Sequence, residues 1–278
     1  MKYCILTFAL IPLLASGAEA PKDSCFDCHK VMEGTSDVFK DDVHYHNTIS
    51  CVDCHGGDPK EDTANVSMSP DRGFKVRVTR QGTPEFCGSC HSEAAYMGKF
   101  SPQMRVDQLA LYRGSVHGKQ LAAGRKGAAE CVDCHSIHNI RAGSDPLSPA
   151  SPQHVTDTCS KCHTAAADLF RKSPHSRFNS ERRPGCTVCH ASHATEPAGT
   201  AMLAGGTSVC VRCHNATSAG GKAAAQIAQY LAGLEAAGPA SSQALARARL
   251  AVHSFNLAAI KQAAETPAPA TNAVPKAP

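Results

Sequence analysis

A five-residue motif, Cys-x-x-Cys-His, occurs seven times between residues 25 and 214. It takes up 14 of the 15 cysteines, and a histidine directly follows every cysteine pair. The paired cysteines are Cys25 and Cys28, Cys51 and Cys54, Cys87 and Cys90, Cys131 and Cys134, Cys159 and Cys162, Cys186 and Cys189, and Cys210 and Cys213. The histidines that complete the motifs are His29, His55, His91, His135, His163, His190 and His214. Whatever this chain folds into must accommodate seven copies of one reactive group.

The spacing of the motif fits the covalent attachment of haem c. Two cysteines three positions apart can form thioethers to the two vinyl groups of one haem, and the adjacent histidine can then bind the iron from one face. Disulfides would explain an even number of exported cysteines but not the histidine after every pair. Tetrahedral zinc sites need two cysteine pairs each and iron–sulfur clusters need four thiolates each, so neither fits seven pairs. The sequence therefore predicts seven covalently attached haems c.

Composition agrees with a fold that is organised around these groups. The chain of 278 residues has nine Phe, five Tyr and no Trp, so it offers few large side chains for a core. Seven haems would leave about 37 residues of mature chain for each. We expect a mainly α fold with short elements and extensive loops around a chain of packed haems. The intervals between motifs vary, which excludes a regular solenoid.

The first 20 residues read as a secretory signal peptide. Lys2 precedes an apolar run from residue 4 to residue 15, and small residues follow up to Ala20. No other segment is apolar enough to span a membrane, so the mature chain is expected to have no membrane span. The predicted location is the periplasm or another exported compartment. A net charge of only +4 also argues against a nucleic-acid partner.

Eight further histidines could supply the second axial ligand of seven irons. They are His44, His46, His117, His138, His154, His175, His193 and His253. His138 and His193 each follow a motif histidine by three residues, so both would share its side of a helical turn and would have to serve a neighbouring haem. His117 and His175 share a Ser-x-His pattern that suggests an internal duplication. His154 lies just before the fifth motif and is also a ligand candidate.

Two assignments among these histidines are less direct. His44 and His46 are alternatives, because an extended chain would point them to opposite sides, and we favour His44. His253 lies in the Ala-rich C-terminal part, on the same helical face as Leu250, Leu257 and Ile260. A core histidine is the alternative there, but we expect a helix that covers the last haem. The methionines are assigned to packing.

The expected domain organisation follows from these patterns. Residues 1–20 form the signal peptide and residues 21–221 form the heptahaem domain, with a soft division near residue 125. The most helix-like stretch between motifs spans residues 103–121. Residues 222–265 should form two helices, broken at Gly238 and Pro239, that cap the haem domain. Residues 266–278 alternate Pro and Ala and are predicted to be a disordered tail.

With these motifs, the chain resembles the periplasmic multihaem cytochromes c that carry doubled Cys-x-x-Cys-His motifs, of the cytochrome c3 and c7 kind. The resemblance rests on the attachment motifs, on His55-Gly56-Gly57, on Ser115 to Gly118, and on the Cys-His-x-x-His segments that end at His138 and His193. It implies an electron conduit between a membrane quinol-oxidising complex and a downstream acceptor. Resemblance at this level indicates the cofactor and not the partner.

Three functions compete at this point. The first is one-electron transfer along haems that each have two histidine ligands, with no catalytic residue. The second is a multihaem reductase of small nitrogen or sulfur oxyanions, which needs one iron with an open position. The third is a polymeric or storage cytochrome. Eight spare histidines for seven irons leave no open iron in the simplest allocation, which favours the electron carrier.

Overall fold

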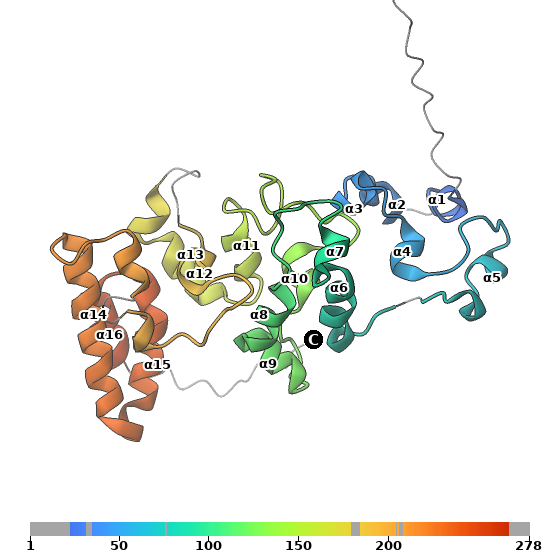
Figure 1. The fold of residues 1–278 in the computed structure, drawn as a ribbon. Coiled ribbons are helices and arrows are strands. Elements are labelled where there is room, and N and C mark those ends of the chain that lie inside the picture. Colours follow the sequence, from blue (N-terminus) through green and yellow to red (C-terminus); the bar gives the residue numbers. More distant parts are fainter. Residues whose placement is uncertain are drawn as a thin grey trace, which may run out of the picture. The chain divides into compact units, whose positions relative to one another are not determined.

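The structure, a computed structural model, describes residues 23–31, 35–75, 77–178, 184–203, 205 and 208–266. Over these residues the chain consists of short helices and long loops, and no strand occurs among them (Figure 1). The expected mainly α fold with extensive loops is confirmed. The expected signal peptide and residues 267–278 of the expected tail lie outside the described residues. No helix in the described part is both long and apolar enough to cross a membrane.

The chain divides into two compact units. The first comprises residues 1–33 and 50–76, and the second comprises residues 34–49 and 77–278. The position near residue 125, where the sequence suggested a soft division, falls inside the second unit.

The first unit holds the first two motifs in α1 (Ser24–His29) and α4 (Cys51–His55), followed by α5 (Ala64–Ser67) and η1 (Pro70–Arg72). Helices α1 and α4 pack on each other. Ser24 ties the start of α1 to a loop, because its N–H donates to the Pro59 carbonyl at 2.8 Å and its hydroxyl donates to the Glu61 carbonyl at 2.8 Å. Gly56 ends α4 with a φ of 66°, in the left-handed region that favours glycine.

The second unit begins with α2 (Thr35–Phe39) and α3 (Val43–His46) and continues after the first unit with η2 (Arg80–Gly82), α6 (Thr83–His91) and α7 (Ala94–Met97). Next come α8 (Gln108–Gly114), α9 (Val116–Ala122), α10 (Cys131–His135), α11 (Val155–Ser160) and α12 (Thr164–Arg171). Then follow η3 (Pro174–Arg177), α13 (Cys186–His190), η4 (Thr200–Met202) and η5 (Val209–Arg212), of which α13 holds the sixth motif and η5 the start of the seventh. Most of these elements are one or two turns long, and they position the motifs.

The stretch 103–121, expected to be the most helix-like between motifs, contains two helices from residue 108 onward. Helix α8 ends at Gly114 and α9 starts at Val116, because Ser115 between them is extended, with a ψ of 165°. The Ser115 hydroxyl caps α9 by accepting from the Gly118 N–H at 3.0 Å. A side chain at position 118 would place its Cβ 2.1 Å from the Tyr112 carbonyl oxygen. The local preference of serine for a helix N-cap thus outweighs the helical periodicity across it.

The C-terminal part forms a helical bundle from α14 (Ala219–Ala236), α15 (Ser242–Ala251) and α16 (Leu257–Glu265), with η6 (Gly238–Ser241) and η7 (Val252–Ser254) between them (Figure 1). The expected break at Gly238 is present, with a φ of 74°. The expected second helix is itself interrupted, because Phe255 is left-handed with a φ of 52° and Asn256 caps α16. There are therefore three helices where the sequence suggested two.

The apolar core is concentrated in this bundle. Ile227, Leu231, Ala248, Ala251 and Ile260 form one buried cluster together with Ala264. In the rest of the described chain the buried hydrophobic residues are scattered, and they include Met97, Leu121, Val155 and Phe170. Among the described residues of the part that carries the motifs there is no comparable apolar cluster, as expected if cofactors supply its core.

Candidate functional site

Each Cys-x-x-Cys-His motif lies on a short helical turn. Five of the seven are enclosed by α1, α4, α6, α10 and α13, while Cys159 belongs to α11 and Cys210 to η5. Polar N-caps fix the start of several turns: Asp23 accepts from the N–H groups of Cys25 and Phe26, and Glu130 and Asp133 form a capping box around α10. Residues three apart share one face of such a turn, so the two cysteines of a motif point to the same side.

Five of the motif histidines face a second histidine ring, and all ten residues belong to the second unit. The separations between ring centroids are 5.9 Å for His91 and His44, 5.9 Å for His135 and His193, 6.1 Å for His163 and His117, 6.0 Å for His190 and His253, and 6.0 Å for His214 and His175. The partner is in each case one of the spare histidines that the sequence analysis singled out. Because the five separations are almost the same, we expect the five pairs to have the same function.

The separation fits an iron bound between two imidazoles. A metal–nitrogen bond is about 2 Å long and a ring nitrogen lies about 1 Å from its ring centre, so two axial imidazoles place their ring centres about 6 Å apart. The rings of His175 and Phe255, which meet edge to face, are closer, with centroids 4.1 Å apart. The histidine pairs thus fit a haem iron between them, with the neighbouring cysteines as attachment points.

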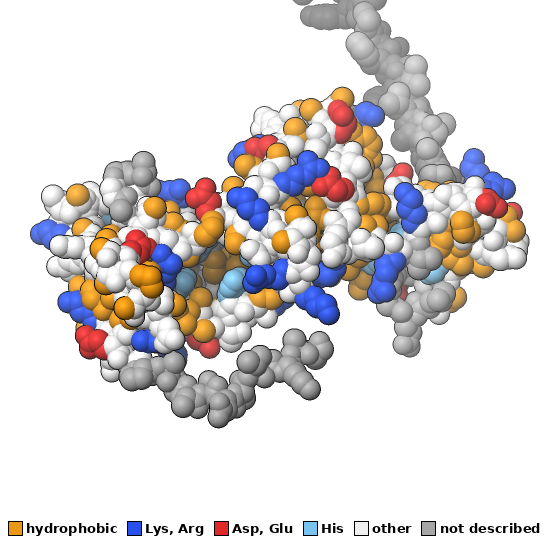
Figure 2. All heavy atoms as spheres, turned by 90° about the horizontal axis from the view of Figure 1, so that it is seen from below, with side chains coloured by type: hydrophobic (Ala, Val, Ile, Leu, Met, Phe, Trp, Pro, Cys, Tyr) orange, Lys and Arg blue, Asp and Glu red, His pale blue; other side chains and the backbone are white. Residues whose placement is uncertain are grey.

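For six of these ten histidines, burial favours the neutral form that binds metal. It lowers the pKa of His91, His117, His135, His175, His190 and His193 below the usual value. For His193 the nearby Asp107 opposes this shift, and Arg105 adds to it. On one face of the molecule, histidine side chains lie among hydrophobic ones (Figure 2).

In the five pairs, the motif that a spare histidine faces is not always the one nearest to it in the sequence. The favoured His44 faces His91 with 23% of its side chain exposed, whereas His46 is exposed and contacts Tyr45. His193 faces His135 of another motif, as its position three residues after His190 requires. His253, which was expected in a helix that covers the last motif, faces His190 of the sixth motif, and η7, which bears it, packs on α12.

The seventh motif is instead faced by His175, which lies between the fifth and sixth motifs in the sequence. His117 likewise faces the fifth motif and not the fourth, which follows it directly. His138 and His154 remain predicted ligands. The second axial ligands opposite His29 and His55 likewise remain predictions. In the first unit, His55 donates from Nδ1 to the Lys75 carbonyl at 2.9 Å, which turns its Nε2 away from the backbone.

The motifs of the second unit follow one another in space in sequence order. Helix α6 packs on α10, α10 on α11, and α11 on α13. Cys87 lies close enough to Cys131, and Cys186 close enough to Cys159, to raise the pKa of the Cys131 and Cys159 thiols. The Arg212 guanidinium joins the last two motifs by donating to the Val188 carbonyl at 3.0 Å. Groups attached to these cysteines would therefore form a row from the third motif to the seventh.

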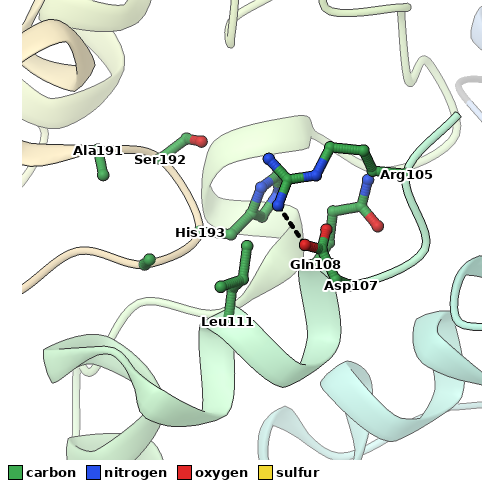
Figure 3. A pocket seen from close by; sticks show the side chains of 8 residues that line it. Arg105, Asp107, Gln108, Leu111, Ala191, Ser192 and His193 are labelled. Atoms are coloured by element: carbon green, nitrogen blue, oxygen red, sulfur yellow. Dashed lines mark hydrogen bonds and ion pairs between the residues drawn. The ribbon is translucent and has the colours of Figure 1, made fainter.

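A pocket of about 460 Å³ lies beside His193. Residues 191–194 line one side and Arg105, Asp107, Gln108 and Leu111 the other, and Figure 3 shows Arg105, Asp107 and Gln108 gathered beside His193. Arg105 forms an ion pair with Asp107. Asp107 Oδ1 and Gln108 Oε1 are buried without a hydrogen-bond partner among the described residues. The pocket thus provides a polar surrounding for one candidate ligand.

Three of the candidate ligands lie in copies of one short segment, and two of these copies share the Ser-x-His pattern of His117 and His175. In each copy an aromatic and a basic residue are followed, after one position, by Asp or Ser, and the histidine comes two residues later. The copies span residues 39–44, 112–117 and 170–175. The Asp or Ser is in each case the N-cap of the element that bears the histidine. The first copy, at residues 39–44, lacks the Ser-x-His pattern because it has Asp42 where the second and third copies have serine.

Comparison with known families agrees with the motif pattern. Residues 43–164 match the sequence model described as cytochrome c3, and residues 175–219 match the one described as the doubled CXXCH motif. Neither curated proteins nor solved structures give a significant match.

Proposed function

Since the chain is a multihaem cytochrome c of the c3-like type, we propose that it binds seven covalent haems c and carries electrons one at a time along them. Haem c supplies a one-electron Fe(III)/Fe(II) couple when it is bound. The cysteines of the seven motifs would hold the haems, and the motif histidines would be the first axial ligands.

The observation that carries this proposal is the set of five histidine pairs with ring centroids about 6 Å apart. With a histidine on both faces, an iron has no open position for a substrate, so it is suited to electron transfer and not to catalysis at the metal. Two imidazole ligands also favour ferric iron more than a methionine ligand does, so the reduction potentials should be low.

The row of motifs in the second unit supports transfer between neighbouring haems. Because α6, α10, α11 and α13 contact one another in sequence order, haems attached to them would be neighbours and could exchange electrons directly. The two motifs of the first unit, on α1 and α4, are likewise adjacent. We further propose that the protein is exported to the periplasm, and that it takes electrons from a membrane quinol-oxidising complex and passes them to a downstream acceptor through short-lived interfaces.

Haem content tests the first part of the proposal. A pyridine haemochrome assay combined with the intact mass should give seven covalent haems per chain. A purified mature protein that carries fewer would contradict the predicted number.

Ligation tests the second part. Electron paramagnetic resonance of the oxidised protein should show only low-spin haem, and the reduced protein should not bind carbon monoxide. One stoichiometric high-spin haem that binds carbon monoxide would favour the reductase over the electron carrier. Co-purification with a membrane complex would identify the electron donor.

A further inference from the structure

We propose that Asp42 sets the reduction potential of the haem on the third motif by holding the ring of its ligand His44. This inference rests on the proposed function, because it takes His44 and His91 as the two ligands of that iron. Asp42 would be a positioning and tuning residue that acts through His44.

The geometry around Asp42 is that of a built site. Its side chain is 1% exposed, and its Oδ1 accepts from both the backbone N–H and the Nδ1–H of His44, each at 2.8 Å. Its Oδ2 accepts from the Ile140 N–H at 2.7 Å, which fixes the carboxylate from the other side. With Nδ1 engaged in this way, Nε2 of His44 is the nitrogen left for the iron, on the side of His91.

The other two copies of the segment show what the same position does without a carboxylate. Ser115 and Ser173 replace Asp42, are equally buried at 2% and 1% exposure, and have the same extended backbone. The Ser115 hydroxyl serves only the backbone, accepting from Gly118 and donating to the Tyr112 carbonyl. Capping the helix therefore needs no carboxylate, so the contact between Asp42 and the His44 ring is an additional feature of the first copy.

The third copy is the opposite case. The Ser173 hydroxyl and His175 Nδ1 are both buried, and neither has a hydrogen-bond partner among the described residues. His253 is intermediate, since its Nδ1 donates to the Leu250 carbonyl at 2.8 Å. The candidate ligands thus differ in what accepts the Nδ1 proton, from a carboxylate at His44 to a carbonyl at His253 and nothing at His175.

This difference has a direct consequence for the iron. A carboxylate that accepts the Nδ1 proton gives the imidazole more anionic character and makes it a stronger donor through Nε2. A stronger donor stabilises ferric over ferrous iron, so the reduction potential falls. The haem on the third motif should therefore have a lower reduction potential than the haem on the seventh. The potentials along the row would differ because the acceptors of the Nδ1 protons differ.

Two reciprocal substitutions test the proposal in the full haem-loaded protein. D42S gives the first copy the serine of the other two, and it should raise one haem potential and move one low-spin resonance signal. S173D offers a carboxylate to His175, and it should lower a different haem potential. We expect each to change the ratio of ferric to ferrous haem at fixed potential about tenfold, which is about 59 mV for a one-electron step. The measurement is a redox titration followed by absorption and by electron paramagnetic resonance.

The control is D41S, which removes the neighbouring carboxylate. Asp41 is 67% exposed and pairs with Arg141, so this variant should leave all potentials in place. If D42S lowers the melting temperature but shifts no potential or resonance signal, Asp42 is only a helix cap and the proposal is wrong. If S173D does not fold, the comparison of the haem potentials of D42S and D41S still tests the proposal. A protein without seven haems would contradict the proposed function instead, and the haemochrome assay distinguishes the two failures.

Discussion

At the scale of single residues, the angle between the two imidazole planes differs among the five histidine pairs. It is 82° for His44 and His91 and 76° for His175 and His214, but 6° for His135 and His193 and 22° for His190 and His253. Nearly perpendicular ligand planes leave two iron d orbitals almost equal in energy, whereas parallel planes separate them. If these four pairs bind haem iron as proposed, the protein would contain two kinds of low-spin haem, with the pair of His117 and His163, at 42°, between them.

Electron paramagnetic resonance of the oxidised protein should show both kinds. We expect strongly anisotropic signals from the third and seventh motifs and rhombic signals from the fourth and sixth. Replacing His175 by Ala should remove one signal of the first kind, and replacing His193 by Ala should remove one of the second. A spectrum with rhombic signals alone would contradict the perpendicular pairs.

His253 provides the sharpest test of a single ligand, because chain order placed it at another haem. In H253A the sixth haem should lose its second ligand, so that one high-spin haem that binds carbon monoxide appears. The exposed His46 is the matched control, and H46A should stay fully low-spin. An unchanged H253A spectrum would show that His253 is not a ligand.

At the scale of elements, the first turn of α14 is built against a motif histidine. Ser218 caps the helix by accepting from the Gly221 N–H at 3.1 Å. At Gly220 a Cβ would lie 2.2 Å from Nδ1 of His214, so no larger residue fits unless that ring moves. The C-terminal bundle therefore packs closely on the seventh motif at Gly220.

The variant G220A should displace the His214 ring and so weaken its bond to the iron of the seventh haem. We expect one haem to change its resonance signal and its potential, while the other signals stay in place. Gly233 lies in the same helix with no atom near its would-be Cβ, so G233A should leave every haem unchanged. Equal effects of the two variants would mean that only helix propensity is at work.

At the scale of the whole molecule, the core made of apolar side chains and the core expected from haems lie in different parts of the chain. The C-terminal bundle buries its own apolar cluster, with Leu231 at 1% and Ile260 at 0% exposure. The elements that bear the motifs are short, and helices of this length are not stable without tertiary packing. Their stability must come largely from the haems, since binding that is confined to the folded state stabilises it.

A chain produced without haem attachment should therefore be folded only in part. We expect slow amide hydrogen exchange to survive in residues 219–265 and to be lost in residues 83–135, where the haem-loaded protein is protected. The haem-free variant L231A, which opens a cavity in the bundle at a cost of about 2–5 kcal/mol, should lose the remaining protection as well. Protection of residues 83–135 without haem would contradict this account.

Much of the site was predictable because its chemistry is local. Five consecutive residues define each attachment motif, and a turn that begins at an N-cap such as Asp23 or Ser50 brings its cysteines to one side. The spare histidines were likewise identified from their number and type. The break at Gly238 was predictable too, since glycine and proline interrupt a helix wherever they occur in it.

The pairing of ligands was decided only by the tertiary structure. His253 lies nearest in sequence to the seventh motif but faces the sixth, because the left-handed turn at Phe255 and the packing of η7 on α12 direct it there. The link between Asp42 and Ile140 joins residues almost a hundred positions apart. The sequence by itself determined which groups this protein carries and which residues can hold them. Which histidine meets which motif depends on contacts between distant segments, and such contacts leave no periodic pattern in the chain.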